Sequence, residues 1–180
     1  MLKVYRTASL RHDTITQATV LNLLLRNYLE YNLYDQANKF ISNINEFRDV
    51  AASSNQHARY LYYTGRIKAV QLDYSDAYTH LSQALRKAPQ YSALGFRKTV
   101  QKLLIIVQLL MGDIPERNVF RQTSLQSALV PYFKLTMAVR VADLGKFKEV
   151  VSQYREVFLA DKNLSLIQRF IPSFLPHLFF

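Results

Sequence analysis

The chain has 180 residues, of which 49% are apolar and 20% are charged, and it contains no Cys, four Gly and five Pro. This balance is typical of a folded domain with a core and excludes a disordered chain. The lack of Cys excludes disulfides, thiol catalysis and thiolate metal sites. A formal net charge of +10 is compatible with nucleic acid, with an acidic protein partner or with a place in a larger, balanced assembly.

No segment of the sequence has the pattern of a secretory signal or of a membrane span. Residues 1–13 lack an apolar core, and the longest apolar run, residues 103–111, is interrupted by Gln108 and is shorter than a bilayer requires. We therefore expect a soluble intracellular protein.

In chain order, the spacing of apolar residues predicts helices almost throughout. Residues 1–15 are a lead-in, either a helix remnant or extended, and helices follow over 16–31 and 34–44. A loop over 49–55 precedes a helix pair over 58–90. Further helices are expected over 92–112, in a short turn at 125–129, over 131–142 with Pro131 at the first position, and over 146–160. The apolar residues 170–180 are expected to form a separate tail.

The helix pair over 58–90 is the pattern around which the chain is organised. Ser75 is a candidate N-cap for its second helix, and Pro89 ends that helix. The residues expected to pack the two helices together are Gly65, Ala77, Leu81 and Ala84. Small residues let antiparallel helices approach closely, as in a tetratricopeptide-type unit. One such pair cannot bury its apolar face alone, so neighbouring pairs must stack on it.

The start of the second helix recurs as an aromatic residue, two polar residues and a small or β-branched residue. The copies are residues 34–37, 74–77 and 147–150, which end at Ala37, Ala77 and Val150. The end points are 40 and 73 residues apart, so a degenerate pair is expected over about 94–122. The sequence thus predicts an all-α fold, a right-handed α-solenoid of tetratricopeptide-like helix pairs.

No group of residues has the spacing of a catalytic or cofactor site. The four His are scattered, the four Gly build no phosphate-binding loop, and neither GxSxG nor HExxH occurs. Asp35, Asp76 and Glu149 fall in expected first helical turns, where a carboxylate favours the helix dipole without any catalytic role. We therefore predict a protein that is not an enzyme and that has no catalytic residues, cofactor or metal.

One electrostatic feature stands out between Asp76 and Asp113, where the sequence has five cations and no carboxylate. These cations are Arg86, Lys87, Arg97, Lys98 and Lys102. They can be solvated cations, contacts to an acidic protein face, or contacts to a phosphate backbone. Phosphate is the least favoured of the three, because no interleaved aromatic residues or groove-reading helix accompany the cations. The five residues are the candidate protein interface.

Six strings of the sequence carry a resemblance to a known family. They are LRHD (10–13), LNLLLRNYLEYNLYDQA (21–37), ARYLYYTGRIKAVQLDYSDA (58–77), ALRKAPQ (84–90), KLLIIVQLLMGDIPER (102–117) and PYFKLTMAVR (131–140). Through them, over about residues 5–169, the chain resembles the 26S proteasome non-ATPase regulatory subunit 3 family. The resemblance implies a scaffold subunit of the lid of the regulatory particle, found in cytoplasm and nucleus, whose helical repeats precede a winged helix in a PCI domain.

This chain departs from the family pattern at both ends. The family has a helical region upstream and continues beyond Arg169 into the winged helix, where this chain has its apolar tail. We expect a chain truncated at both ends, with a lead-in (1–15), a helical-repeat domain (16–169) and a divergent tail (170–180), and without the winged helix.

The expected function is therefore that of a non-catalytic lid subunit whose partners are other lid subunits, supporting ubiquitin-dependent protein degradation. A role as a regulator of the enzymes in that particle is compatible with this. No small-molecule substrate and no membrane partner are expected, and nucleic acid is disfavoured. The alternatives are a scaffold of another PCI assembly, such as the signalosome or translation initiation factor three, and a basic RNA adaptor.

Overall fold

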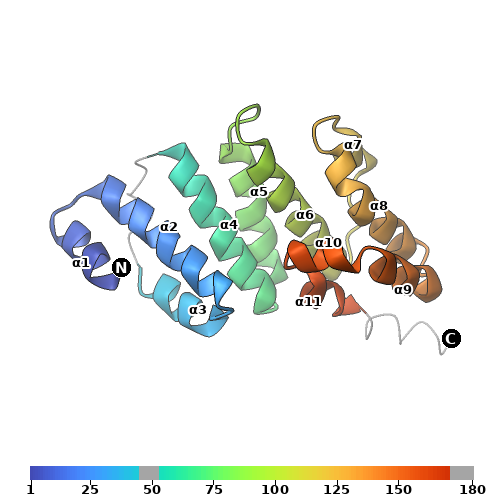
Figure 1. Ribbon diagram of the computed structural model, residues 1–180, viewed down its shortest axis with the longest axis horizontal. Coiled ribbons are helices and arrows are strands. Elements are labelled where there is room, and N and C mark those ends of the chain that lie inside the picture. The colour runs from blue at the N-terminus through green and yellow to red at the C-terminus, as the bar shows by residue number, and fades with distance from the viewer. Residues whose placement is uncertain (45–52, 171–180) are drawn as a thin grey trace. The chain divides into compact units, whose positions relative to one another are not determined.

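A computed structural model describes residues 1–44 and 53–170 of the protein. In these residues the regular secondary structure consists of eleven helices and no strands (Figure 1). The chain divides into two compact units, Met1–Ala93 and Leu94–Phe180. The prediction of an all-α fold built from tetratricopeptide-like helix pairs is confirmed.

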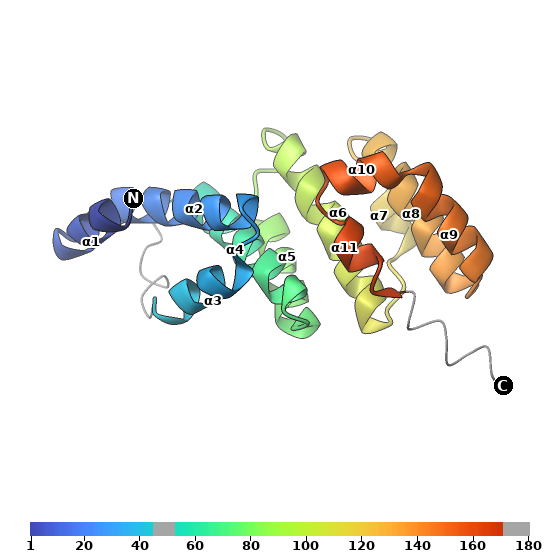
Figure 2. The same ribbon diagram turned by 60° about the horizontal axis from the view of Figure 1, so that its bottom comes forward.

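The first unit contains α1 (Leu2–Leu10), α2 (Thr14–Glu30), α3 (Tyr34–Ser42), α4 (Ser54–Val70) and α5 (Tyr74–Lys87). Helix α1 packs on α2, α2 and α3 pack on α4, and α4 packs on α5 (Figures 1 and 2). The core between the α2–α3 pair and α4 has aliphatic residues at its centre, and partly buried aromatic side chains pack against them. Its fully buried members are Ala18, Leu21, Leu25, Ala37 and Ile67.

The residues expected to be a lead-in belong to this helical array. Ala8 of α1 is buried, and α2 already includes Thr14 and Ile15. The open choice between a helix remnant and an extended segment is thereby resolved in favour of a helix for residues 2–10. Part of the loop expected over 49–55 lies outside the described residues, whereas Ser54 and Asn55 are the first residues of α4.

The second unit contains α6 (Leu94–Met111), α7 (Arg117–Arg121), α8 (Gln126–Arg140), α9 (Leu144–Gln153), α10 (Arg155–Ala160) and α11 (Leu164–Ile167). Helix α8 packs against α6, α7 and α9, and α10 packs against α9 and α11. Phe170 is buried, with its ring centroid 5.9 Å from that of Phe147. It therefore belongs to the helical unit and not to a separate tail, while the rest of the expected tail lies outside the described residues.

Six turns between helices share one backbone geometry. In each of these six turns, a residue with positive φ follows the end of the helix, and the N–H of the next residue donates to the carbonyl five residues back. The residues with positive φ are His12, Asn32, Leu72, Gly112, Ala142 and Lys162. This is the Schellman arrangement, which satisfies carbonyls left open at a helix C-terminus.

The residue after each of these turns is usually Asp or Asn. It is Asp13, Asp73, Asp113, Asp143 and Asn163 in five turns and Leu33 in the sixth. Asp13, Asp73 and Asp143 also cap the next helix, accepting hydrogen bonds from the N–H three residues on at 3.1, 3.3 and 2.9 Å. One short turn thus ends one helix and begins the next.

Three local predictions are corrected by these turns and caps. The N-cap of α5 is Asp73 and not Ser75, because the Asp73 carboxylate reaches the free N–H of Asp76. The helix predicted over 146–160 begins earlier, at Leu144, and is interrupted at Tyr154, where φ is −109° and ψ is 21°. Glu149 consequently lies in the second turn of α9 and not in the first.

Pro131 lies inside α8, so the prediction that it opens a helix is wrong. Its ring supplies no N–H to the carbonyl of Ser127, four residues earlier. Ser127 is exposed, so water can donate to that carbonyl in place of the missing N–H. The helix therefore continues through Pro131 instead of starting there.

Candidate functional site

The five basic residues of the candidate interface fall in both units. Arg86 and Lys87 lie exposed in the last turn of α5, where they favour the helix dipole. Arg97 and Lys98 lie half-buried in the first turns of α6. Arg86 and Lys87 thus belong to the first compact unit, and Arg97, Lys98 and Lys102 belong to the second.

The Arg86–Lys87 end of α5 lies close to the N-terminal half of α4. Partial burial lowers the pKa of His57, and the charge of Lys87 lowers that pKa further. The lowered pKa favours the uncharged imidazole, so His57 adds less positive charge beside Arg86 and Lys87 than an exposed histidine would.

Lys102 differs from the prediction, because it is engaged within its own unit. Its Nζ lies 2.8 Å from both carboxylate oxygens of Asp161, and the two side chains are only 15% and 22% exposed. The Tyr132 hydroxyl donates to Asp161 at 2.8 Å and accepts from Asn163 Nδ2 at 3.0 Å. This cluster holds the α10–α11 turn against α6 and α8. Sequence spacing missed it because Asp161 is 59 residues away from Lys102.

Gly65 lies where α4 and α5 approach most closely. A Cβ atom at this position would be 2.8 Å from Leu81 Cγ and 3.3 Å from the carbonyl oxygen of Ala77. Ala77, Leu81 and Ala84 are all 0% exposed. The absence of a Cβ at Gly65 therefore makes room for Leu81 between the two helices.

The third copy of the repeat has a different register from the one predicted. Four residues after the residue that follows the positive-φ position (Leu33, Asp73 or Asp143) stand Ala37 in α3, Ala77 in α5 and Phe147 in α9. Ala37 and Ala77 are 0% exposed and Phe147 is 1% exposed, whereas Val150 is only half-buried. The aromatic residue that aligned with Tyr34 and Tyr74 in sequence is thus the packing residue itself, and Val150 is one helical turn further on.

The turn between α4 and α5 also carries a small charged cluster. Lys68 lies 3.1 Å from Asp73 and 3.5 Å from Asp76. The hydrogen bond from Lys68 lowers the pKa of Asp73, and the hydrogen bond from the Asp76 N–H lowers it further. The same hydrogen bond to Asp73 raises the pKa of Lys68. These charges are explained by capping and local pairing.

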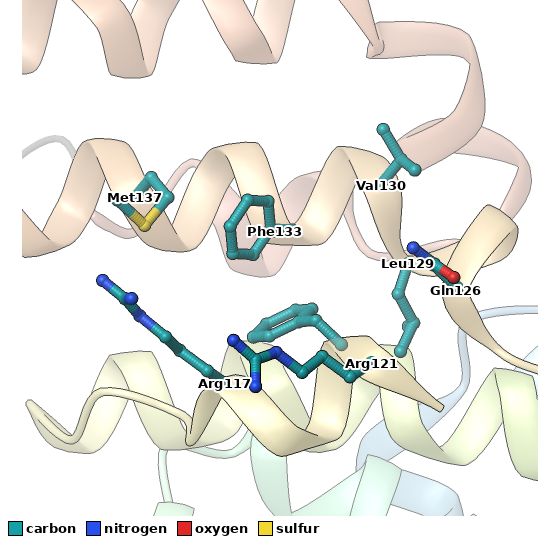
Figure 3. Close-up of a pocket in the computed structure, with 8 residues that line it drawn as sticks. Arg117, Arg121, Gln126, Leu129, Val130, Phe133 and Met137 are labelled. Atoms are coloured by element: carbon teal, nitrogen blue, oxygen red, sulfur yellow. The ribbon is translucent and has the colours of Figure 1, made fainter. Parts of the chain in front are cut away.

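A groove that the sequence did not predict lies between α7 and α8, with a volume of about 370 Å³. Its apolar wall includes Phe133, 39% exposed, which meets Phe120 edge-on at 5.1 Å between ring centroids. Figure 3 shows Phe133 and Met137 pointing from α8 toward α7, which contributes Arg117 and Arg121. The expected degenerate pair over about 94–122 contains α7, but its sequence did not indicate how short that helix would be.

Two further properties bear on what the arrangement can do. Across residues 1–44 and 53–170, no three His, Asp or Glu side chains converge as a metal site would require. In the same part of the chain, none of the helices combines the length and the apolar character needed to span a bilayer.

Capped helix pairs, packed on one another within all-α units, define a helical-repeat protein of the tetratricopeptide type. A family model described as "PSMD3-like, N-terminal TPR repeats" matches residues 1–136, and the chain belongs to this family. It is 57% identical over 169 residues to 26S proteasome non-ATPase regulatory subunit 3 of Dictyostelium discoideum, covering 94% of this chain and 33% of that protein.

Two other relatives show the same relationship. The chain is 56% identical to the probable 26S proteasome non-ATPase regulatory subunit 3 of Drosophila melanogaster, over 91% of this chain and 33% of that protein. It is 52% identical to the probable 26S proteasome regulatory subunit rpn3 of Schizosaccharomyces pombe, over 94% of this chain and 34% of that protein. The chain thus spans about a third of the length of the curated relatives it matches.

Proposed function

We propose that this chain is a non-catalytic structural subunit of the lid of the 26S proteasome regulatory particle. Its helix pairs would hold neighbouring subunits in place by protein–protein contacts and so serve ubiquitin-dependent protein degradation. The observation that carries the proposal is the 57% identity over 94% of the chain to a proteasome regulatory subunit. Identity at this level makes a shared set of contact surfaces the simplest expectation.

The proposed partners are other lid subunits, with no small-molecule substrate and no membrane partner, and the proposed location is the cytoplasm and nucleus. Any effect on enzyme activity would be indirect, through the placement of catalytic subunits. The proteasome names of the relatives favour this assignment over the signalosome and translation initiation factor three.

RNA binding is a weaker candidate. Lys102, one of the five cations on which it would depend, is paired with Asp161. A salt series of RNA binding would test this alternative, because phosphate contacts weaken steeply as salt rises. We expect weak binding that charge reversal at Arg97 and Lys98 leaves unchanged.

Affinity purification tests the lid assignment. The tagged chain is expressed beside a tagged full-length subunit 3, and the proteins recovered with each are quantified by mass spectrometry. We expect lid subunits with both baits, in constant ratio to one another. Recovery with the full-length subunit but not with this chain would contradict the proposal. A Gly65→Leu chain serves as the matched control, since it disrupts the α4–α5 pair without changing charge.

A further inference from the structure

The groove between α7 and α8 exists because α7 is too short to cover α8. Helix α7 has five residues, whereas α5, the second helix of the preceding pair, has 14. In the first unit, Ile67 of α4 is 0% exposed because the α2–α3 pair covers it. Met137 stands at the same distance before its turn in α8, and there it is only half-buried. A face that is buried in α4 is therefore partly open in α8.

The open face of α8 has the spacing that a partner helix would meet. Val130, Phe133 and Met137 follow one another at three and four residues, which places them on one side of the helix. Val130 is 41% and Phe133 is 39% exposed. An apolar stripe of this kind matches the anchors of an amphipathic helix laid in a groove.

The charge of the groove determines the character of that helix. Arg117 and Arg121 are four residues apart on α7, both are exposed, and both line the groove (Figure 3). In the part of the chain that the structure describes, neither guanidinium forms an ion pair. None of the lining residues is acidic. Carboxylates on the incoming helix would complete these two cations.

We propose that the α7–α8 groove binds an acidic amphipathic helix, with apolar anchors against Phe133 and Met137 and carboxylates against Arg117 and Arg121. The bound helix supplies the turns that α7 lacks and buries the open face of α8. This inference rests on the proposed function in one respect, since it assigns the helix to a neighbouring subunit.

The probe is a helix-stapled peptide of about 15 residues with Leu on one face and Glu along both edges of that face. A matched peptide carries Lys in place of every Glu. Binding of each peptide to the 180-residue chain is measured by fluorescence anisotropy at low and high salt. We expect the acidic peptide to bind about tenfold more tightly at low salt, with the difference shrinking as salt screens the charges.

Two variants and a control locate the binding. The double variant Arg117→Glu/Arg121→Glu should reverse the order of the two peptides, and Phe133→Ala should weaken both by about tenfold. The control is Lys148→Glu/Arg155→Glu, which makes the same change in net charge at exposed residues of α9 and α10 outside this groove. Circular dichroism establishes that each variant is folded.

Equal binding of the two peptides, or equal effects of the groove and control variants, would overturn the proposal. Sedimentation measures the oligomeric state of the chain. A dimer formed through this groove would also overturn the proposal, because a second copy of the chain would then be the occupant. The peptides need no other proteasome subunit. If the peptides do not bind but lid subunits are still recovered with the chain, the groove proposal is wrong and the lid assignment stands. If the peptides bind but lid subunits are not recovered, the lid assignment is wrong and the binding of an acidic helix in the groove stands.

Discussion

The helix pairs α4–α5 and α8–α9 have the same turn and different packing. Both turns have a residue with positive φ followed by an Asp that caps the next helix. Eight residues before that Asp, α4 has Gly65 and α8 has Leu135, which is 0% exposed. Four residues after it, α5 has Ala77 and α9 has Phe147. One pair packs through small residues and the other through large ones.

This comparison shows that backbone turns and side-chain packing are specified separately. The Schellman turn and the Asp cap depend on local hydrogen bonds, so they recur where the packing residues do not. In one pair Leu81 packs beside Gly65, and at the matching position of the other pair the buried residue is Phe147 in place of an alanine.

Replacing Phe147 with Ala should have the largest effect of the changes considered. Its 1% exposed ring fills the space beside α8 and contacts Phe170, so we expect a loss of about 3–5 kcal/mol in unfolding free energy. Val150→Ala, at a half-buried position, should cost less than about 1 kcal/mol. Urea denaturation of both variants measures this difference. A larger loss for Val150→Ala would mean that Val150, as the aromatic pattern predicted, is the packing residue of α9.

Gly65→Leu should destabilise the close pair by about 3 kcal/mol, because even a Cβ atom at this position would lie 2.8 Å from Leu81 Cγ. Gly95→Leu is the matched control, since a Cβ at that position would meet nothing within 4 Å apart from its chain neighbours and the backbone of its own helix. Thermal unfolding followed by circular dichroism compares the two. Adding Leu81→Ala to Gly65→Leu should recover part of the loss, and strict additivity of the two costs would argue against direct contact.

Lys102→Met should cost about 2 kcal/mol, since it leaves the Asp161 carboxylate without its cation at a site that is only 22% exposed. Lys98→Met, one turn earlier on α6, should cost less than about 0.5 kcal/mol. Chemical denaturation distinguishes a structural role of Lys102 from an interface role. Unchanged stability of Lys102→Met would return this residue to the candidate interface.

Asp73→Ala should remove about 1 kcal/mol of stability through loss of the α5 cap. The hydrogen bond from Lys68 lowers the pKa of Asp73 in the folded state. The contribution of Asp73 to stability is therefore complete above the pKa of its carboxyl in the unfolded chain, which is near 4. It is lost as pH falls through the lower pKa of the same carboxyl in the folded state. Stability of Asp73→Ala should consequently fall less between pH 5 and about pH 2 than that of the unmodified chain. Parallel denaturation curves at a series of pH values measure this, and equal slopes would contradict the assignment.

Local patterns in the sequence were enough to predict most of the fold. The all-α class, the close approach at Gly65 and the start of α3 at Tyr34 follow from short-range spacing and residue size. The register of α9 did not follow, because an aromatic residue was matched by type. The Asp residues at 73 and 143 would have given the correct register, since they report the turn geometry itself.

Features that depend on distant residues could not be predicted in the same way. The pairing of Lys102 with Asp161 needs the α10–α11 turn to fold against α6, and no local spacing encodes that. The α7–α8 groove depends on the length of α7, which is bounded by extended backbone at Glu116 and Gln122. The open face of α8 was therefore visible only in three dimensions.

Competition for one position in the lid tests the central claim most directly. Lids are isolated through a tag on another lid subunit from cells that contain both this chain and full-length subunit 3, and their masses are measured by native mass spectrometry. If the chain is a scaffold that uses the family's contact surfaces, each particle should contain either the chain or the full-length subunit, never both. Particles that contain both, or a complete absence of the chain from lids while it is present in the cell, would contradict the account.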